Sequence, residues 1–209
     1  MKFVLFVEGH TERRAISPFL KRWLDAKLPN RVGITVSRFE GCREFITDVE
    51  QRTRITLNAP SGRDVLGIIG LLDWYGMPLE VPSRIETRQE RVDWATQEIE
   101  NRVSDARFKM FFAVHEFEAW LFSDATVFPS SVRERLVRDG RLPEAVNDGE
   151  PPARLLERLY PQCVNRDYKK RVDGVQMFGK LDPKMVYDKC PNFRRLADTM
   201  LEMAQSHDE

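Results

Sequence analysis

Four short strand-like segments, three of them continuous apolar runs, constrain the fold of this chain more than any other feature of its sequence. They cover residues 2–7, 32–37, 65–72 and 108–114. The first, KFVLFV, has no polar alternation, which is typical of a strand buried on both faces of a parallel sheet. Stretches with apolar residues at helical spacing lie between the runs, at 12–28, 43–58 and 86–104. Strands that alternate with helices predict an α/β fold, with a mainly parallel four-stranded sheet flanked by helices.

The pattern changes after residue 115, where helical spacing replaces apolar runs. We expect a short helix at 116–122 and further helices at 130–139, 151–160 and 191–205. The sequence therefore predicts an α/β domain over residues 1–125. A helical C-terminal extension, residues 126–209, is expected to pack on it.

Composition limits the classes of function. The chain of 209 residues holds 33 basic and 33 acidic side chains, so any anionic partner must be bound by a local patch rather than by net charge. Its three cysteines are widely spaced, which argues against a zinc site and favours a reducing compartment. No apolar stretch approaches a membrane span, and no basic stretch leads into a signal-type segment. We predict a cytoplasmic protein.

Acidic residues follow three of the four predicted strands. Glu8 follows the first, Asp73 follows the third, and Glu116 comes after His115 at the end of the fourth. Because parallel strands end at one edge of a sheet, and ligands of open α/β sheets bind beyond that edge, these acids should converge. Glu12 and Glu118 are further candidates for the same cluster.

A cluster of carboxylates favours a divalent cation, because the like charges otherwise repel one another. Mg²⁺ or Mn²⁺ takes such oxygen ligands, and a pair of ions can stabilise both oxygens of a phosphodiester cleavage. Each acid also has a simpler explanation. Glu12 suits the first turn of a helix, Asp73 suits a turn, and on a helix Glu116 and Glu118 point to different faces.

Four ordered motifs resemble a known family: VEGHTE at 7–12, LLDWYGMP at 71–78, HEFEAWLFSD at 115–124 and YKKRVDG…KCPNF at 168–193. A strand followed by Glu-Gly-x-Thr-Glu, with a later strand closed by Asp, resembles the Toprim domain of topoisomerases, bacterial primases and OLD-family nucleases. Together the motifs are similar to a family of small bacterial Toprim-like proteins. These are often encoded beside ABC/SMC-like ATPases and are suspected to act in defence against phage.

The resemblance implies roles for individual acids. It implies that Glu8 is the central acid, either metal ligand or general base, and that Glu12 is a second metal-binding Glu. It also implies that Asp73 is the first acid of the Toprim Asp-x-Asp element. The sequence departs from that element at Tyr75, where the second Asp would stand. Glu116 or Glu118 would then have to supply the missing ligand.

A basic segment supplies the candidate substrate surface. Residues 166–195 contain nine Lys or Arg and four Asp, a net charge of plus five in a neutral chain. Phosphates would bind there, with Tyr168 stacking on a base; the candidates are Tyr168, Lys169, Lys170, Arg171 and Lys180. The resemblance also implies a catalytic lysine near the metals, for which Lys169, Lys170 and Lys180 are candidates. The alternative is a solvated basic face that binds an acidic partner.

Two functions from different classes follow. The first is a Mg²⁺- or Mn²⁺-dependent nuclease acting on DNA or RNA and controlled by a partner ATPase. The second is a non-catalytic, Toprim-like regulatory subunit of such an ATPase. A weaker third possibility is a phosphoryl-transfer enzyme acting on a small nucleotide.

Overall fold

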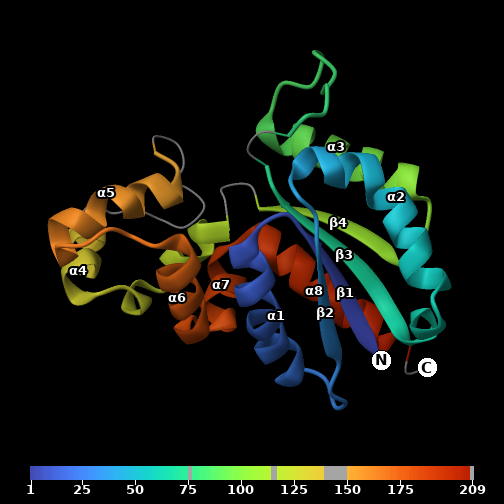
Figure 1. Cartoon of the computed structure of the whole chain (residues 1–209), viewed down its shortest axis with the longest axis horizontal. Coiled ribbons are helices and arrows are strands. Elements are labelled where there is room, and N and C mark those ends of the chain that lie inside the picture. The colour runs from blue at the N-terminus through green and yellow to red at the C-terminus, as the bar shows by residue number, and fades with distance from the viewer. Residues whose placement is uncertain (75–76, 114–116, 139–149, 208–209) are drawn as a thin grey trace.

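Figure 1 shows the computed structural model, which describes residues 1–74, 77–113, 117–138 and 150–207, without the side chains of residues 10–13. Its centre is a four-stranded parallel sheet in the order β2-β1-β3-β4. The strands are β1 (Lys2–Val7), β2 (Gly33–Arg38), β3 (Val65–Asp73) and β4 (Phe108–Ala113). The α/β fold with a mainly parallel sheet, predicted from the apolar runs, is confirmed.

The strand register brings the ends of β1, β3 and β4 to the same edge. Val7 of β1 pairs with Leu71 of β3, and Asp73, the last residue of β3, pairs with Ala113 of β4. Beyond the sheet, the N–H of Trp74 donates to the carbonyl oxygen of Ala113 at 2.9 Å. The side chain of Glu8, the residue after β1, therefore starts beside the C-terminal part of β3.

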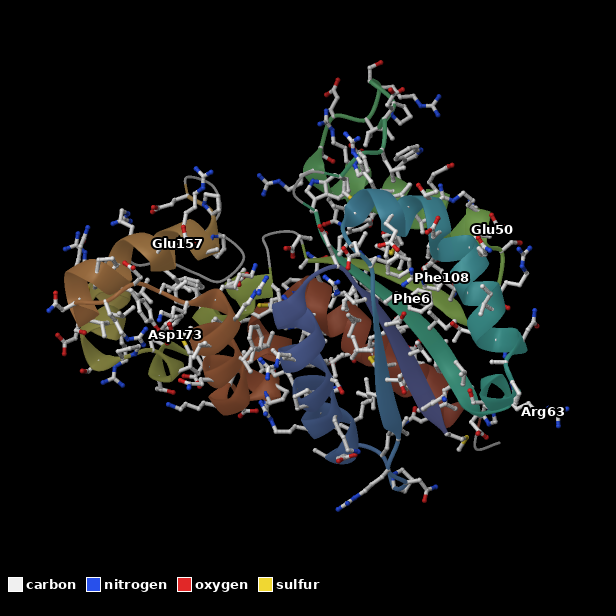
Figure 2. The ribbon with its side chains drawn as sticks, viewed as in Figure 1. Phe6, Glu50, Arg63, Phe108, Glu157 and Asp173 are labelled. Carbon is white, nitrogen blue, oxygen red and sulfur yellow. The ribbon has the colours of Figure 1, made fainter. Side chains whose placement is uncertain are left out.

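Helices cover both faces of the sheet (Figure 1). One core cluster packs α1 (His10–Asp25) and α8 (Pro191–Gln205) on the side of Phe3 and Leu5. The other packs α2 (Cys42–Asn58) and α3 (Arg88–Val103) on the side of Val4 and Phe6. Phe6 and Phe108, labelled in Figure 2, both belong to this second cluster. Alternate residues of β1 thus face opposite cores, which explains its continuous apolar run.

Short helices fill the C-terminal part of the chain. The described ones include the 3₁₀ helices η2 (Phe117–Ser123) and η3 (Ala125–Val127), then α4 (Ser130–Arg138), α5 (Pro152–Val164), the π-helical turn η5 (Lys170–Gly174), α6 (Val175–Lys180) and α7 (Pro183–Lys189). In Figure 1, α6 and α7 lie between α1 and the α4–α5 pair. A further 3₁₀ turn, η1 (Pro60–Asp64), precedes β3.

The C-terminal helices share a core with α1. Phe178 of α6 stacks on Phe117 of η2, with ring centroids 4.0 Å apart, and meets Phe19 of α1 edge-on at 5.7 Å. Arg22 of α1 also donates to the carbonyl oxygens of Phe178 and Leu181, at 2.9 and 2.6 Å. The C-terminal helices are therefore anchored on the sheet domain through α1. The division at residues 125 and 126 stays a prediction.

Several boundaries differ from the sequence prediction. The first helix ends at Asp25, not near residue 28, and α6, α7 and η5 were not predicted. The helix predicted from residue 86 begins at Arg88, because Thr87 caps it: its Oγ1 accepts from the N–H of Glu90, and the Glu90 side chain accepts from the N–H of Thr87. Among the helices that the structure describes, none is both long and apolar enough to cross a membrane.

Candidate functional site

Glu8 lies in the turn between β1 and α1. Its side chain is partly buried, and Gly9 is the extended residue that precedes the first turn of α1. Gly41, just before α2, lies beside it: a Cβ added to Gly41 would stand 3.9 Å from Oε1 of Glu8. Gly41 has φ of +123°, a conformation open mainly to glycine, so the loop before α2 is built to pass close to Glu8.

Asp73 ends β3 and is held by the segment that follows β4. Its Oδ1 accepts a hydrogen bond from the backbone N–H of Phe117 at 3.1 Å. Its side chain is only partly buried. The carboxylate is therefore fixed by the first residue of η2 while part of the side chain faces solvent.

Cys42, the first residue of α2, lies close to both acids. Burial, together with the negative charges of Glu8 and Asp73, raises the pKa of its thiol to about 12. Its Sγ lies 3.1 Å from Sδ of Met77. Both strand-end carboxylates thus act on one thiol, which places them on the same side of the sheet edge. Sequence reasoning missed Cys42, since it treated the three cysteines only as a redox indicator.

Glu118, a predicted metal ligand, is buried beside a lysine. It belongs to η2, a helix whose residues are all buried, and its own side chain is 1% exposed. Its Oε1 lies 3.0 Å from Nζ of Lys170 in η5. The structure therefore gives this acid a cation from the C-terminal region as its charge partner. Lys170, predicted to bind nucleic acid or to act in catalysis, is likewise engaged in the fold.

The structure does not describe the side chains of two further predicted metal ligands, Glu116 and Glu12. Nor does it describe Tyr75, which stands where the Toprim element would have its second Asp. Glu116 and Tyr75 fall among the residues left out. Glu12 is in the first turn of α1, but its side chain is not described. Among the side chains that are described, no group of three or more His, Cys, Asp or Glu is arranged to hold a metal ion.

Tyr168 is buried in the core, which corrects its predicted role in base stacking. The residue is 7% exposed, and its ring packs edge-on against Tyr160 with centroids 5.1 Å apart. A ring in this position has no free face for a base. The neighbouring Lys169, Arg171 and Lys180 are exposed, and none of them forms a side-chain ion pair with another described residue.

Much of the predicted basic surface is neutralised within the fold. Arg166 makes a two-pronged contact with Asp173, at 2.8 and 2.7 Å, and the N–H of Lys169 donates to the same carboxylate at 2.7 Å. Hydrogen bonding to Arg166 holds the pKa of Asp173 below its ordinary value. Lys184 pairs with Asp188 within α7. Both acids are already counted in the net charge of plus five. Lys170 and Arg195 pair instead with acids outside the segment, Glu118 and Asp93.

Comparison with known proteins gives a family match and a structural likeness. The sequence profile of a protein family described as "Domain of unknown function (DUF4276)" matches residues 7–201. The structure is similar to the C-terminal region of the Burkholderia pseudomallei OLD protein, with a TM-score of 0.43 at 18% sequence identity, over 93% of this chain and 98% of that chain. None of the curated proteins matches the sequence at a significant level.

Proposed function

The chain belongs to the family of domains of unknown function DUF4276, and from its strand-end acids we propose a Toprim-like, Mg²⁺- or Mn²⁺-dependent nuclease that hydrolyses phosphodiester bonds in DNA or RNA. One observation carries the proposal. Glu8 follows β1 and Asp73 ends β3, which are adjacent parallel strands, and both acids raise the pKa of the same Cys42 thiol. Two carboxylates on separate elements at the ligand-binding edge of an open sheet are what cation-assisted phosphoryl chemistry uses.

The donor chemistry of the described residues fits Mg²⁺ better than it fits a softer metal. Mg²⁺ is commonly bound through one or two carboxylates, with waters and substrate phosphates completing its shell, so a third protein ligand is not required. Glu8 and Asp73 would hold the ion, and Glu12 and Glu116 are further proposed ligands. When bound, such an ion lowers the pKa of a coordinated water and neutralises charge on the phosphate oxygens.

The chain's own residues would orient this site. The N–H of Phe117 fixes Oδ1 of Asp73, so that its carboxylate does not need to reorganise when a cation binds. Gly41 leaves room beside Oε1 of Glu8. The pairing with Glu118 makes Lys170 a positioning residue. The exposed Lys169 is the better candidate for a cation that contacts phosphate.

A cleavage assay tests the proposal. Single-stranded and duplex DNA and RNA are incubated with Mn²⁺ and the wild type, Glu8→Gln, Asp73→Asn or Glu50→Gln. Glu50 is an exposed acid on α2, labelled in Figure 2, and serves as the matched control. We expect cleavage by the wild type and Glu50→Gln only. Equal cleavage by all four proteins would assign the activity to a contaminant and overturn the proposal.

A second candidate is the non-catalytic module, a regulatory subunit of an ABC/SMC-like ATPase, and one observation favours it. Among the residues that the structure describes, no group of three or more His, Cys, Asp or Glu is arranged to hold a metal ion. In either case we propose that an ATPase of this class is the partner and that the pair acts against phage. Intact substrates in every reaction, together with no uptake of Mn²⁺ or Mg²⁺ at millimolar concentration, would select this candidate.

A further inference from the structure

A cavity of about 360 Å³ lies between the segment that joins β3 to α3 and the start of α3. The described part of this segment, residues 77–87, rises above α3 in Figure 1. The cavity is lined by Trp74, Met77, Leu79, Val81 and Arg91. Its volume lies within the range of about 300–1,000 Å³ that is typical of small-ligand sites. Its lining begins with Trp74, the residue after the last residue of β3, so the cavity lies beyond the carboxyl end of that strand.

Trp74 forms a fixed aromatic wall of this cavity. Its backbone N–H donates a hydrogen bond to the carbonyl oxygen of Ala113. Its ring meets the buried Phe112 edge-on, with ring centroids 5.3 Å apart at an interplanar angle of 85°. The side chain is partly exposed although it belongs to the second core cluster. An indole braced on one edge by a core ring, with another part open to a cavity, is a preorganised stacking surface.

Arg91 supplies the positive charge of the same cavity. It is exposed on the first turns of α3, and its Nε donates to the carbonyl oxygen of Ile85 at 3.1 Å, which orients the guanidinium. The other lining side chains, Met77, Leu79 and Val81, are partly buried and apolar. The cavity thus offers one aromatic face, an apolar wall and one cation.

We propose that this cavity receives an unpaired nucleobase, stacked on Trp74, while Arg91 neutralises a phosphate of the same strand. The choice of a nucleic acid rests on the proposed function. A base has a flat apolar face and is joined to an anion, which matches the two kinds of wall. Bases of a duplex are already stacked and paired, so the protein is expected to prefer single-stranded DNA or RNA. Because stacking contacts the base and not the sugar, both single-stranded DNA and single-stranded RNA should bind.

Binding to matched oligonucleotides tests this without requiring cleavage. A twelve-residue oligo-dA, its oligo-rA counterpart, the dA·dT duplex and an abasic strand of equal charge are titrated by fluorescence anisotropy in EDTA. We expect the wild type to bind both single strands more tightly than the abasic strand or the duplex. Trp74→Ala should weaken single-strand binding about 5- to 150-fold and leave abasic binding unchanged. Arg91→Gln should weaken the binding of base-bearing and abasic strands to a similar degree.

A second measurement covers the case in which Trp74→Ala fails to fold. Single strands should quench tryptophan fluorescence of the wild type, whereas Trp74→Phe should bind them with little quenching, because a phenyl ring still stacks. Equal affinity for base-bearing and abasic strands, or unchanged binding by folded Trp74→Ala, overturns the inference even if the protein cleaves nucleic acid. Base-dependent binding without cleavage in Mn²⁺ supports the inference and counts against the nuclease.

Discussion

The Nζ of Lys170 lies 3.0 Å from Oε1 of Glu118, whose side chain is 1% exposed, and this ion pair joins the C-terminal region to the segment that follows β4. Lys170 itself is 37% exposed. A buried acid depends on its cation far more than a partly hydrated lysine depends on its acid. The pair therefore fixes η2, and with it the N–H of Phe117 that holds Asp73.

We predict unequal effects of removing either partner. Lys170→Met should lower the free energy of unfolding by about 3 kcal/mol, because it removes a cation from beside a buried carboxylate. Glu118→Gln should cost less, about 1–2 kcal/mol, since Lys170 can be hydrated. Urea unfolding of both variants and of the double variant measures the coupling. Strictly additive losses would show that the two groups do not stabilise each other.

The contact between Arg166 and Asp173 should make stability depend on pH on the acid side. The folded-state pKa of Asp173 is held below its ordinary value of 3.8 by hydrogen bonding to Arg166. The stabilisation is thus complete above the unfolded-state pKa and is lost as the pH falls through the lower folded-state pKa. Asp173→Asn should reduce stability at pH 7 and flatten this acid limb. Urea unfolding midpoints of the wild type and Asp173→Asn are measured between pH 7 and pH 3. Parallel dependences of the midpoint on pH in the two proteins would contradict the account.

The thiol of Cys42 should report on the two candidate metal ligands. With a pKa near 12 it should react slowly with iodoacetamide at pH 8, whereas the partly exposed Cys163 serves as the internal reference. Asp73→Asn or Glu8→Gln should accelerate labelling, because each removes a negative charge that disfavours the thiolate. Mn²⁺ should do the same in the wild type. Peptide mass spectrometry gives the labelling rate at each cysteine. Identical Cys42 rates in all samples would show that the charges of Glu8 and Asp73 do not influence the thiol.

Gly41 should resist substitution where another surface glycine does not. Gly41→Ala forces a Cβ onto a residue with φ of +123°, which should cost about 1–3 kcal/mol and displace the loop beside Glu8. Gly179→Ala is the matched control, because an added Cβ there meets nothing within 4 Å and the site is helical. Thermal unfolding compares the two variants. Equal melting temperatures would show that the Gly41 conformation is not strained for alanine.

The strand-end positions of Glu8 and Asp73 could be predicted from sequence because they depend on a local pattern: an apolar run marks a strand, and parallel strands share an edge. The burial of Tyr168 and the charge partner of Glu118 could not be predicted in this way. Tyr168 stands beside three basic residues, as a surface aromatic would, and only the fold brings Tyr160 against it. Glu118 lies in an apolar segment that predicts burial, but its charge partner is Lys170, a contact between distant parts of the chain.

Uptake of Mn²⁺ tests most directly whether Glu8 and Asp73 form a cation site. Electron paramagnetic resonance of free aqueous Mn²⁺, titrated with wild type, Glu8→Gln, Asp73→Asn and the control Glu50→Gln, gives the dissociation constant of each. We predict that the wild type and Glu50→Gln bind Mn²⁺ equally, and that each of the other two variants binds at least about tenfold more weakly. Equal binding by all four proteins, or no binding by the wild type, would contradict the account.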